Sequence, residues 1–512
     1  MSDDPAPPDG PDFTLGVAPG DLVDGKLAGH VGEAAVLLVR AEGALFAVDA
    51  LCTHYHGPLA EGLVVGAAIR CPWHHACFDL ATGEATRAPA LAPLARWKVE
   101  ERDGRIFVTA KLEPPAARDR AAAKVGADTP RRIVIVGGGA AGFAAAEMLR
   151  REAFAGDIVM LSAEAAAPLD RPNLSKDYLA GSAPEDWLPL RPEGFYAEAG
   201  IDLRLGVEVT AIDLAARQVI AADGAVHPWD RLLLATGAEP VRLTVPGADQ
   251  PHIHPLRSLA DSRAIIAAAA GARRALVIGA SFIGLEAAAA LRARGVEVHV
   301  IAPEARPMER VLGPGIGDFV RALHEEHGMI FHLEDTVTAF DGARARLKSG
   351  GAIEADLVVV GVGVRPRLDL AERAGLTLDR GVKVDAHLET SAPGVFAAGD
   401  IARWPDPHSG AVIRVEHWVV AERHGQIAAR NILGWNEPCT LAPFFWSQHY
   451  DTPINYVGHA EAWDEIAVEG DIQAKDCLLK YKKEGRVLAV ASIFRDLDSL
   501  KAELAMEREA GG

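Results

Sequence analysis

A strand–glycine–helix pattern occurs twice in this chain and constrains its fold more than any other feature. In the first copy, the β-branched run Ile133–Val136 leads into Gly137-Gly138-Gly139-Ala140-Ala141-Gly142 and then into a helix-forming stretch, Phe143–Arg151. Glycines at this spacing let the backbone turn tightly and approach a diphosphate, which rests on the helix N-terminus. The pattern therefore predicts a dinucleotide-binding α/β unit. Its expected cofactor-binding residues are Gly137, Gly139, Ala140, Ala141 and Gly142.

The second copy begins with Arg274–Ile278, followed by Gly279-Ala280-Ser281-Phe282-Ile283-Gly284 and a helical stretch, Leu285–Arg294. Ser281 replaces the middle glycine and is small enough to preserve close approach. Gly279, Ser281 and Gly284 are the expected contacts. Two such units predict two dinucleotides; the alternative is that one of the turns only packs a helix on a strand and binds no ligand.

Two short loops near the start of the chain combine cysteine with histidine. The first is Cys52-Thr53-His54 and the second is Cys71-Pro72-Trp73-His74. Two thiolates and two imidazoles can hold a Rieske [2Fe–2S] cluster, with Cys52 and Cys71 on one iron and His54 and His74 on the other. A structural zinc site uses the same ligand types and is the alternative. Each histidine is paired with its own cysteine, which favours iron.

The hydrophobic pattern changes along the chain and predicts several domains: all-β at first, then α/β, with a small α+β domain at the end. The expected divisions are a disordered terminus (1–11), an all-β domain (12–111), a linker rich in Pro and Ala (112–130), a first dinucleotide domain (131–250 and 372–440), a second inserted in it (251–371), and a C-terminal domain (441–512).

Charge and cysteine usage limit the possible partners and compartment. The 512 residues carry a formal net charge of −19, which argues against nucleic acid or an anionic membrane as a partner. The five cysteines form no disulfide framework, so we expect a cytoplasmic protein. No signal peptide and no apolar run long enough to span a bilayer are visible. The sequence does not indicate the oligomeric state.

The cysteine–histidine region, from Cys52-Thr53-His54-Tyr55 to Cys77-Phe78-Asp79, resembles a Rieske-type ferredoxin domain. His56 and His75 stand where such domains usually have glycine. Because glycine tolerates positive φ most readily, these histidines predict a different backbone angle at both positions. They are expected either to sit near the cluster and titrate with it or to be solvated loop residues.

The remaining chain, from 131 to about 500, resembles NADH-dependent ferredoxin reductases and apoptosis-inducing-factor-like flavoproteins. Three segments carry the resemblance: Leu169-Asp170-Arg171-Pro172-Asn173-Leu174-Ser175-Lys176, Leu234-Ala235-Thr236-Gly237-Ala238 and Phe396-Ala397-Ala398-Gly399-Asp400. The resemblance implies FAD as a bound cofactor and NADH or NADPH as a substrate. The C-x4-C redox disulfide of glutathione-reductase-type enzymes is missing from the sequence, so electrons are expected to leave the flavin directly.

The resemblance also implies roles for particular residues. Asp400 is expected at the ribityl chain, Glu164 at the adenosine ribose, and Lys176, Glu286 and Trp418 at the reacting rings. Further residues expected at the cofactors are Arg171, Thr236, Gly237, Gly399, Glu416 and His417. Ala302 stands where the family usually carries an acid in the second dinucleotide domain. Glu304 is expected to take the place of this acid, and we therefore expect a preference for NADH over NADPH. Arg306 is the opposing feature, because it offers a partner for the 2′-phosphate of NADPH.

The sequence thus predicts a flavoenzyme that passes electrons from NAD(P)H through FAD to a built-in Rieske cluster. The expected final acceptor is a protein, such as an oxygenase component. One alternative is an NAD(P)H oxidase or an apoptosis-inducing-factor-like redox sensor. Another is a non-catalytic binding protein whose assembly responds to NADH.

Overall fold

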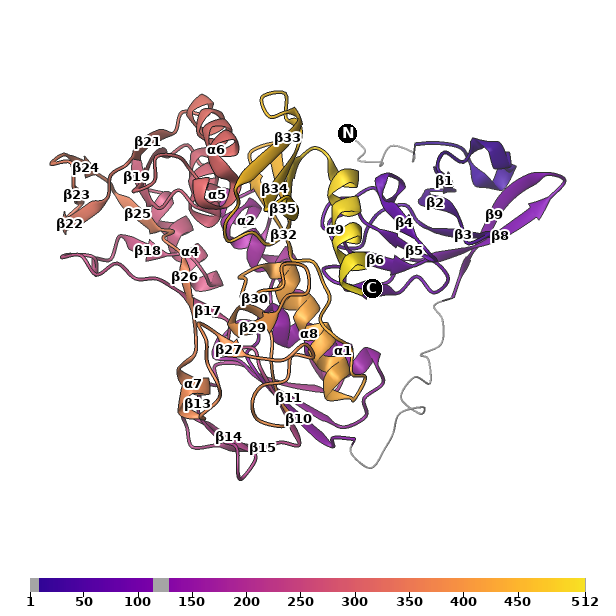
Figure 1. The fold of residues 1–512 in the computed structure, drawn as a ribbon, viewed down its shortest axis with the longest axis horizontal. Helices are drawn as coiled ribbons and strands as arrows, with labels where there is room; N and C mark the ends of the chain where they lie inside the picture. The colour runs from indigo at the N-terminus through magenta and orange to yellow at the C-terminus, as the bar shows by residue number, and fades with distance from the viewer. Residues whose placement is uncertain (1–8, 114–128, 512) are drawn as a thin grey trace. The chain divides into compact units, whose positions relative to one another are not determined.

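The computed structural model describes residues 9–113 and 129–511, and the chain divides into two compact units. The first unit comprises Met1–Lys124 and Asp496–Ala505, and the second comprises Val125–Arg495 and Met506–Gly512. Figure 1 follows the chain through both units by colour. The predicted disordered terminus and linker fall largely outside the described residues.

The first unit is built on two antiparallel sheets, which confirms the predicted all-β fold. One has the order β1-β2-β3-β8-β9 and the other β4-β5-β6-β7. Strand β2 is buried on both faces: Leu37 and Val39 pack with the predicted ligands Cys52 and Cys71, whereas Leu38 faces a second core cluster. The strands are β1 (Lys26–Val31), β2 (Ala34–Ala41), β3 (Ala44–Asp49), β4 (Leu63–Val65), β5 (Ala68–Arg70), β6 (Cys77–Asp79), β7 (Ala85–Arg87), β8 (Arg96–Arg102) and β9 (Arg105–Leu112).

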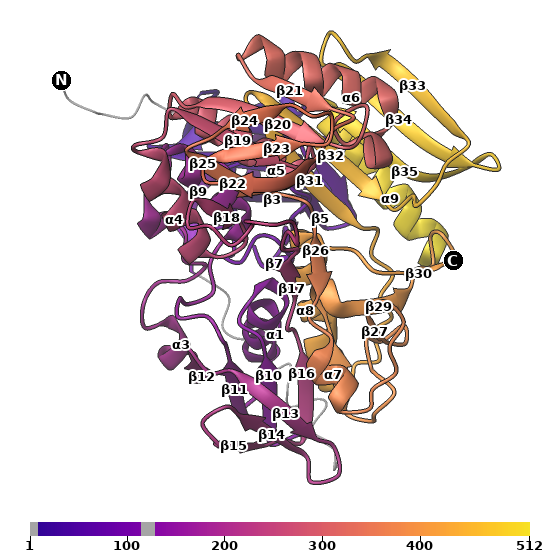
Figure 2. The same cartoon turned by 90° about the vertical axis from the view of Figure 1, so that its left-hand side faces the viewer.

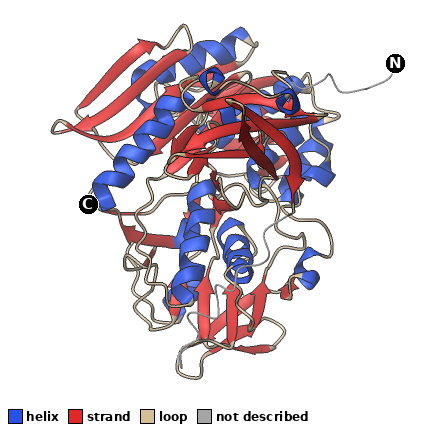
Figure 3. Ribbon diagram, turned by 90° about the vertical axis from the view of Figure 1, so that its right-hand side faces the viewer, coloured by secondary structure: helices blue, strands red, loops and turns tan. Residues whose placement is uncertain are grey.

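The second unit contains the first dinucleotide fold, a parallel sheet of order β12-β11-β10-β16-β28. Helix α1 follows β10 across the glycine turn, and α8 packs against α1 (Figures 2 and 3). Because β10 is covered on both faces, Ile133–Val136 is a continuous apolar run. The elements are β10 (Arg132–Val136), α1 (Ala140–Arg151), β11 (Asp157–Leu161), β12 (Ile201–Arg204), β16 (Arg231–Leu234), β28 (Val395–Ala397) and α8 (Trp418–Ile432).

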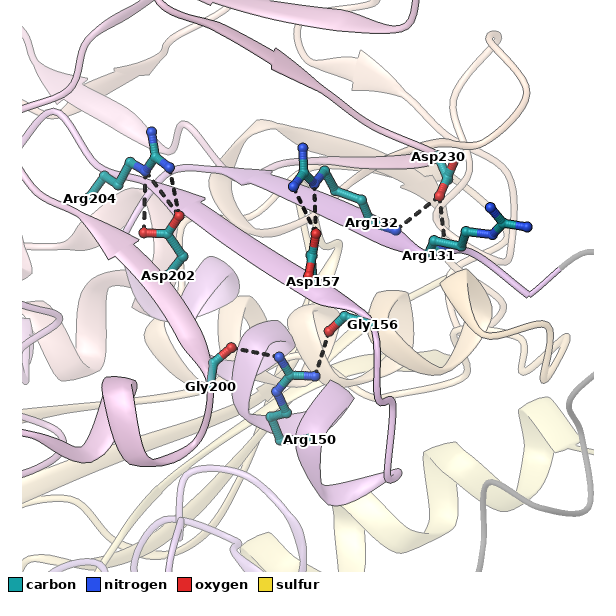
Figure 4. A network of polar contacts seen from close by, with 9 residues as sticks. All are labelled: Arg131, Arg132, Arg150, Gly156, Asp157, Gly200, Asp202, Arg204 and Asp230. Carbon is teal, nitrogen blue, oxygen red and sulfur yellow. Dashed lines mark hydrogen bonds and ion pairs between the residues drawn. The ribbon is translucent and has the colours of Figure 1, made fainter.

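Arginines join neighbouring strands of this sheet and hold helix α1 in place, as Figure 4 shows. Arg132 and Asp157 lie opposite each other on neighbouring strands, and the guanidinium Nη2 is 2.8 Å from the carboxylate Oδ2. Arg150, at the end of α1, donates to the carbonyls of Gly156 (2.9 Å) and Gly200 (2.6 Å). These bonds fix α1 and, with it, the glycine turn at its other end.

The second dinucleotide fold repeats this plan with the order β18-β25-β19-β20-β21, again parallel. Helix α6 is kinked where Gly313, with φ 76°, precedes Pro314. The elements are β18 (Ile253–Pro255), α4 (Leu259–Ala269), β19 (Arg274–Ile278), α5 (Phe282–Ala293), β20 (Glu297–Ala302), α6 (Glu309–Glu326), β21 (Ile330–Leu333) and β25 (Leu357–Val360).

Smaller sheets and short helices complete these domains. They are β13 (Val209–Asp213), β14 (Gln218–Ala221), β15 (Val226–Pro228), β17 (Ala238–Pro240), β22 (Val337–Asp341), β23 (Arg344–Leu347), β24 (Ala352–Glu354), β26 (Val364–Pro366), β27 (Val382–Lys383), β29 (Ala402–Pro405), β30 (Val412–Ile413), α2 (Asp177–Ala180), α3 (Phe195–Glu198) and α7 (Asp369–Arg373).

The C-terminal region forms an antiparallel sheet of order β31-β32-β35-β34-β33, followed by helix α9 (Asp496–Gly511). The division at 441–512 treated this region as one domain. By its packing, however, Asp496–Ala505 belongs to the first unit. The strands are β31 (Phe444–His449), β32 (Thr452–Gly458), β33 (Glu465–Asp471), β34 (Asp476–Lys483) and β35 (Arg486–Ile493).

Candidate functional site

The four predicted cluster ligands come together as two pairs. Cys52 and His54 follow β3, and Cys71 and His74 lie in the turn between β5 and β6. The two thiols hydrogen-bond to each other, and the Nδ1 atoms of the two imidazoles lie 3.2 Å apart. Among the described residues, no three or more His, Cys, Asp or Glu side chains are placed to hold one metal ion. A pair of thiols beside a pair of imidazoles suits a cluster of two irons.

The surroundings of the thiols also fit a cluster. The backbone N–H of His54 donates to the sulfur of Cys52 at 3.5 Å. The hydrogen bond with Cys71 holds the pKa of Cys52 below its usual value, and the same contact, with burial, raises that of Cys71. Burial lowers the pKa of His54 to about 3, so its imidazole is neutral and able to ligate. A Cβ at Gly57 would lie 2.8 Å from the Cys71 sulfur, which shows how tightly the first loop covers the second.

His56 and His75 differ from expectation. Both keep a positive φ, 58° and 59°, so the predicted change of backbone angle is wrong and the histidines adopt the conformation usual for glycine. His56 is exposed, as a solvated loop residue would be. His75, in contrast, is fully buried, and its Nδ1 lies 3.2 Å from the carboxylate of Glu503 on α9, a partner that no local sequence pattern identifies.

The first glycine turn leaves space where a diphosphate would bind. A Cβ at Gly137 would meet the carbonyl oxygen of Ala235 at 2.1 Å, and one at Gly142 would meet that of Gly137 at 1.9 Å. Those two glycines permit close packing. Gly139 is different, because a Cβ added there would meet only the Nη2 atom of Arg171, at 3.8 Å. Gly139 caps α1, so the open space lies at a helix N-terminus beside a cation. Ala140 and Ala141 form the first turn of α1.

The second glycine turn has the same construction. Cβ atoms at Gly279 and Gly284 would meet carbonyl oxygens at 2.4 and 2.3 Å. The hydroxyl of Ser281 donates to the carbonyl of Gly361 at 2.8 Å, so it turns toward the protein rather than toward the helix N-terminus. Ser281, in place of the middle glycine, therefore preserves the turn.

Charged side chains surround the first turn in alternation. Arg171 binds the carboxylate of Glu164, and Arg257 donates to that of Asp400 at 2.7 Å. Arg414 donates to the backbone carbonyl of Asp400 at 3.0 Å. Sequence reasoning missed Arg257 because it precedes α4 outside any glycine motif. Its only local signal is the capping box that follows it, formed by Ser258 and Asp261.

Lys176 and Glu286 meet in a buried network. The Nζ of Lys176 donates to Oε2 of Glu286 at 2.9 Å, and the hydroxyl of Ser175 donates to the same oxygen at 2.7 Å. The hydroxyl of Ser447 donates to Oε1 at 2.6 Å. Glu286 is only 4% exposed, so an ionised carboxylate there depends on these donors. Lys176 also lies over the ring of Trp446, at 5.8 Å from its centroid.

The other predicted cofactor residues lie at strand and helix ends. Thr236 and Gly237 follow β16, Gly399 and Asp400 follow β28, and Glu304 follows β20. His417 caps α8 and Trp418 is its first residue, directly after Glu416. A Cβ at Gly399 would meet Ala141 and Ala421 at 3.1 and 3.3 Å, so this glycine permits the close packing of α1 and α8.

Comparison with known proteins matches three stretches of the chain to families. Residues 131–425 match the family described as pyridine nucleotide-disulphide oxidoreductase, residues 16–98 the Rieske [2Fe-2S] domain, and residues 444–511 the reductase C-terminal domain. Among the helices in the described ranges, none has both the length and the apolar character needed to span a bilayer.

Individual relatives agree with these matches. Apoptosis-inducing factor 3 of Homo sapiens is 31% identical over 492 residues, covering 93% of this chain and 81% of that protein. The ferredoxin–NAD(+) reductase component of the anthranilate 1,2-dioxygenase system of Burkholderia cepacia is 38% identical, covering 70% and 90%. The covalent putidaredoxin reductase–putidaredoxin complex contains a chain of similar structure, with a TM-score of 0.72, 33% identity and coverage of 74% and 93%.

Proposed function

Because this chain belongs to the pyridine nucleotide-disulphide oxidoreductase family and carries a Rieske domain, we propose that it is an NAD(P)H-dependent reductase. It passes electrons from NAD(P)H through FAD to its own [2Fe–2S] cluster and then to an acceptor protein. The observation that carries the proposal is the presence, in one chain, of two strand–glycine–helix turns, a Lys176–Glu286 ion pair, and two cysteine–histidine loops whose thiols contact each other and whose imidazoles lie 3.2 Å apart.

The proposed FAD site uses the first glycine turn. The N-terminus of α1 and Arg171 bind the diphosphate, Glu164 binds the adenosine ribose, and Asp400 binds the ribityl chain. Asp400 is paired with Arg257 and Glu164 with Arg171. These arginines hold the two carboxylates near the positions where they would bind FAD, and the same cations suit a diphosphate. NAD(P)H occupies the second turn, with Gly279, Ser281 and Gly284 at its phosphates and Glu304 at its ribose.

Lys176 and Glu286 keep opposite charges beside the site of hydride transfer. FAD supplies the conversion of a two-electron hydride donor into single electrons, which a cluster can accept one at a time. The cation of Lys176 stabilises negative charge on a reduced ring, while Glu286 and its hydroxyl donors hold that cation in position. Trp418, at the start of α8, covers the reacting rings and excludes water.

Anaerobic titration of the purified protein with NADH, followed by visible absorption and EPR, tests the whole path. Loss of oxidised-flavin absorption together with a Rieske-type EPR signal is the expected result. Flavin reduction without that signal, in protein shown to contain iron, would contradict transfer to the cluster. Zinc in place of iron would leave a flavin reductase with a structural N-terminal domain.

A second function is favoured by one comparison. A relative that is matched over 93% of this chain is named apoptosis-inducing factor 3 rather than a ferredoxin reductase. An NAD(P)H oxidase or redox sensor would form peroxide in proportion to the NADH consumed, without a protein acceptor. Measuring peroxide with and without an added ferredoxin or oxygenase component separates the two functions. The cytoplasmic location stays a prediction.

A further inference from the structure

A row of three buried polar groups extends the Lys176–Glu286 network away from the glycine turns. Ser447 and His449 lie on the same face of β31, and His324 lies on α6. All three are fully buried. The Oγ atom of Ser447 is 3.1 Å from Nε2 of His449, and Nδ1 of His449 is 3.1 Å from Nε2 of His324. A continuous chain of hydrogen bonds therefore runs from Glu286 to α6.

The carboxylate at one end decides the direction of every bond in this chain. A serine hydroxyl has one proton, and Ser447 donates it to Glu286. Ser447 must then accept from Nε2–H of His449. The Nδ1 atom of His449 is left as an acceptor and receives Nε2–H of His324. The Nδ1 atom of His324 is buried and has no hydrogen-bond partner within residues 9–113 and 129–511. The chain thus ends at a ring nitrogen that carries no proton.

Both imidazoles are neutral, which this assignment requires. Burial, with a smaller contribution from Lys176, lowers the pKa of His449 to about 3. Burial lowers the pKa of His324 well below its usual value, and His449 and His327 act in the same direction. The aromatic rings of Phe331 and Tyr450 also lie beside His324. Each imidazole therefore has one ring proton, whose position depends on its hydrogen bonds.

We propose that Ser447, His449 and His324 are positioning residues that keep the Glu286 carboxylate turned toward Lys176. Lys176 and Ser175 both bind Oε2, so the hydroxyl of Ser447 supplies the donor for Oε1. His449 fills the acceptor position of that hydroxyl and so fixes its direction. The catalytic meaning of this arrangement rests on the proposed function, whereas the proton positions do not.

Nitrogen-15 NMR of the histidine rings in the full-length oxidised protein, without NADH, tests the proton positions directly. In the unmodified protein, His449 and His324 should both show the Nε2–H tautomer. In Glu286→Gln, the amide oxygen should face the donors Lys176 and Ser175, which places the NH2 group against Ser447. The hydroxyl must then donate to Nε2 of His449, so His449 donates from Nδ1 to His324. Both rings should therefore change to the Nδ1–H tautomer.

A second substitution shows whether the effect travels through Ser447. In Ser447→Ala combined with Glu286→Gln, both rings should give the same signals as in Ser447→Ala alone, because the link is missing. A charged ring or an Nδ1–H tautomer in the unmodified protein would overturn the proposal, and so would unchanged tautomers in Glu286→Gln. Such a failure is distinct from failure of the NADH titration, which would overturn the proposed function and leave the proton positions intact.

Stopped-flow measurement of flavin reduction by NADH tests the positioning role. His449→Phe can neither donate to Ser447 nor accept from His324, and it should slow reduction by about two- to tenfold, the range for one buried hydrogen bond. His449→Gln keeps a donor and an acceptor and should restore most of the rate. Equal rates in the Phe and Gln variants would overturn the positioning role.

Discussion

At the scale of single residues, one carboxylate is expected to select the nicotinamide dinucleotide. Glu304 lies just beyond β20, and its partner Arg310 is 82% exposed, so the pairing restrains it little. Arg306, the candidate partner for a 2′-phosphate, is already bound by Asp318 at 2.8 Å and by Glu309 at 3.3 Å. A carboxylate paired only with an exposed arginine, while Arg306 is held by other acids, favours NADH, whose ribose carries a hydroxyl at that position.

Glu304→Gln should therefore raise kcat/KM for NADPH relative to NADH by about tenfold, as expected for removing a repulsion of about 1.4 kcal/mol. Steady-state kinetics with both dinucleotides give the ratio. Glu326→Gln, an exposed change at the end of α6, should leave it unaltered. An unmodified enzyme that prefers NADPH would contradict the assignment of Glu304.

The residues that could be predicted from the sequence are those whose chemistry is local. The glycine turns and the two cysteine–histidine loops are each encoded within a few consecutive residues, so spacing alone was sufficient to find them. The partners of Glu286 could not be found in this way, because Ser447 lies 161 positions from it. The backbone at His56 and His75 was predicted wrongly because the loop imposes positive φ even on a residue that disfavours it.

At the scale of elements, the first part of helix α9 packs with the first unit and not with the C-terminal domain to which the sequence assigned it. The α+β domain predicted at 441–512 ends in this helix, which extends over Asp496–Gly511. Its packing depends on Glu503, which is fully buried and lies 3.0 Å from Arg70, 3.2 Å from His75 and 3.8 Å from Arg87. No local pattern reveals this contact, since Arg70 and Glu503 are 433 positions apart.

Replacing Glu503 with Ala should destabilise the first unit by about 3 kcal/mol, because it removes the buried carboxylate that binds the partly buried Arg70. Thermal unfolding followed by the visible absorption of the cluster reports on this unit, while FAD fluorescence reports on the second. Glu509→Ala, an exposed change on the same helix, should leave both transitions in place. Equal stability of the Glu503→Ala protein would show that α9 contributes little to the first unit.

At the scale of the whole molecule, the two kinds of redox centre belong to different folding units. All four predicted cluster ligands lie in the first unit, and both glycine turns lie in the second. Domains with separate cores are able to fold separately. Loss of one centre should therefore spare the other, although the complete path from NADH to an acceptor protein requires both.

Paired variants test this separation. Cys71→Ser removes a predicted iron ligand and should abolish the Rieske EPR signal, while NADH-dependent ferricyanide reduction stays within about twofold, since the flavin unit is untouched. Gly137→Ala should do the reverse: its Cβ would meet the Ala235 carbonyl at 2.1 Å, so FAD is lost and iron is retained. Cys77→Ala, a control in the first unit, should keep both centres. Loss of FAD from Cys71→Ser, or retention of its full iron content, would show that the centres depend on each other or that the ligand assignment is wrong.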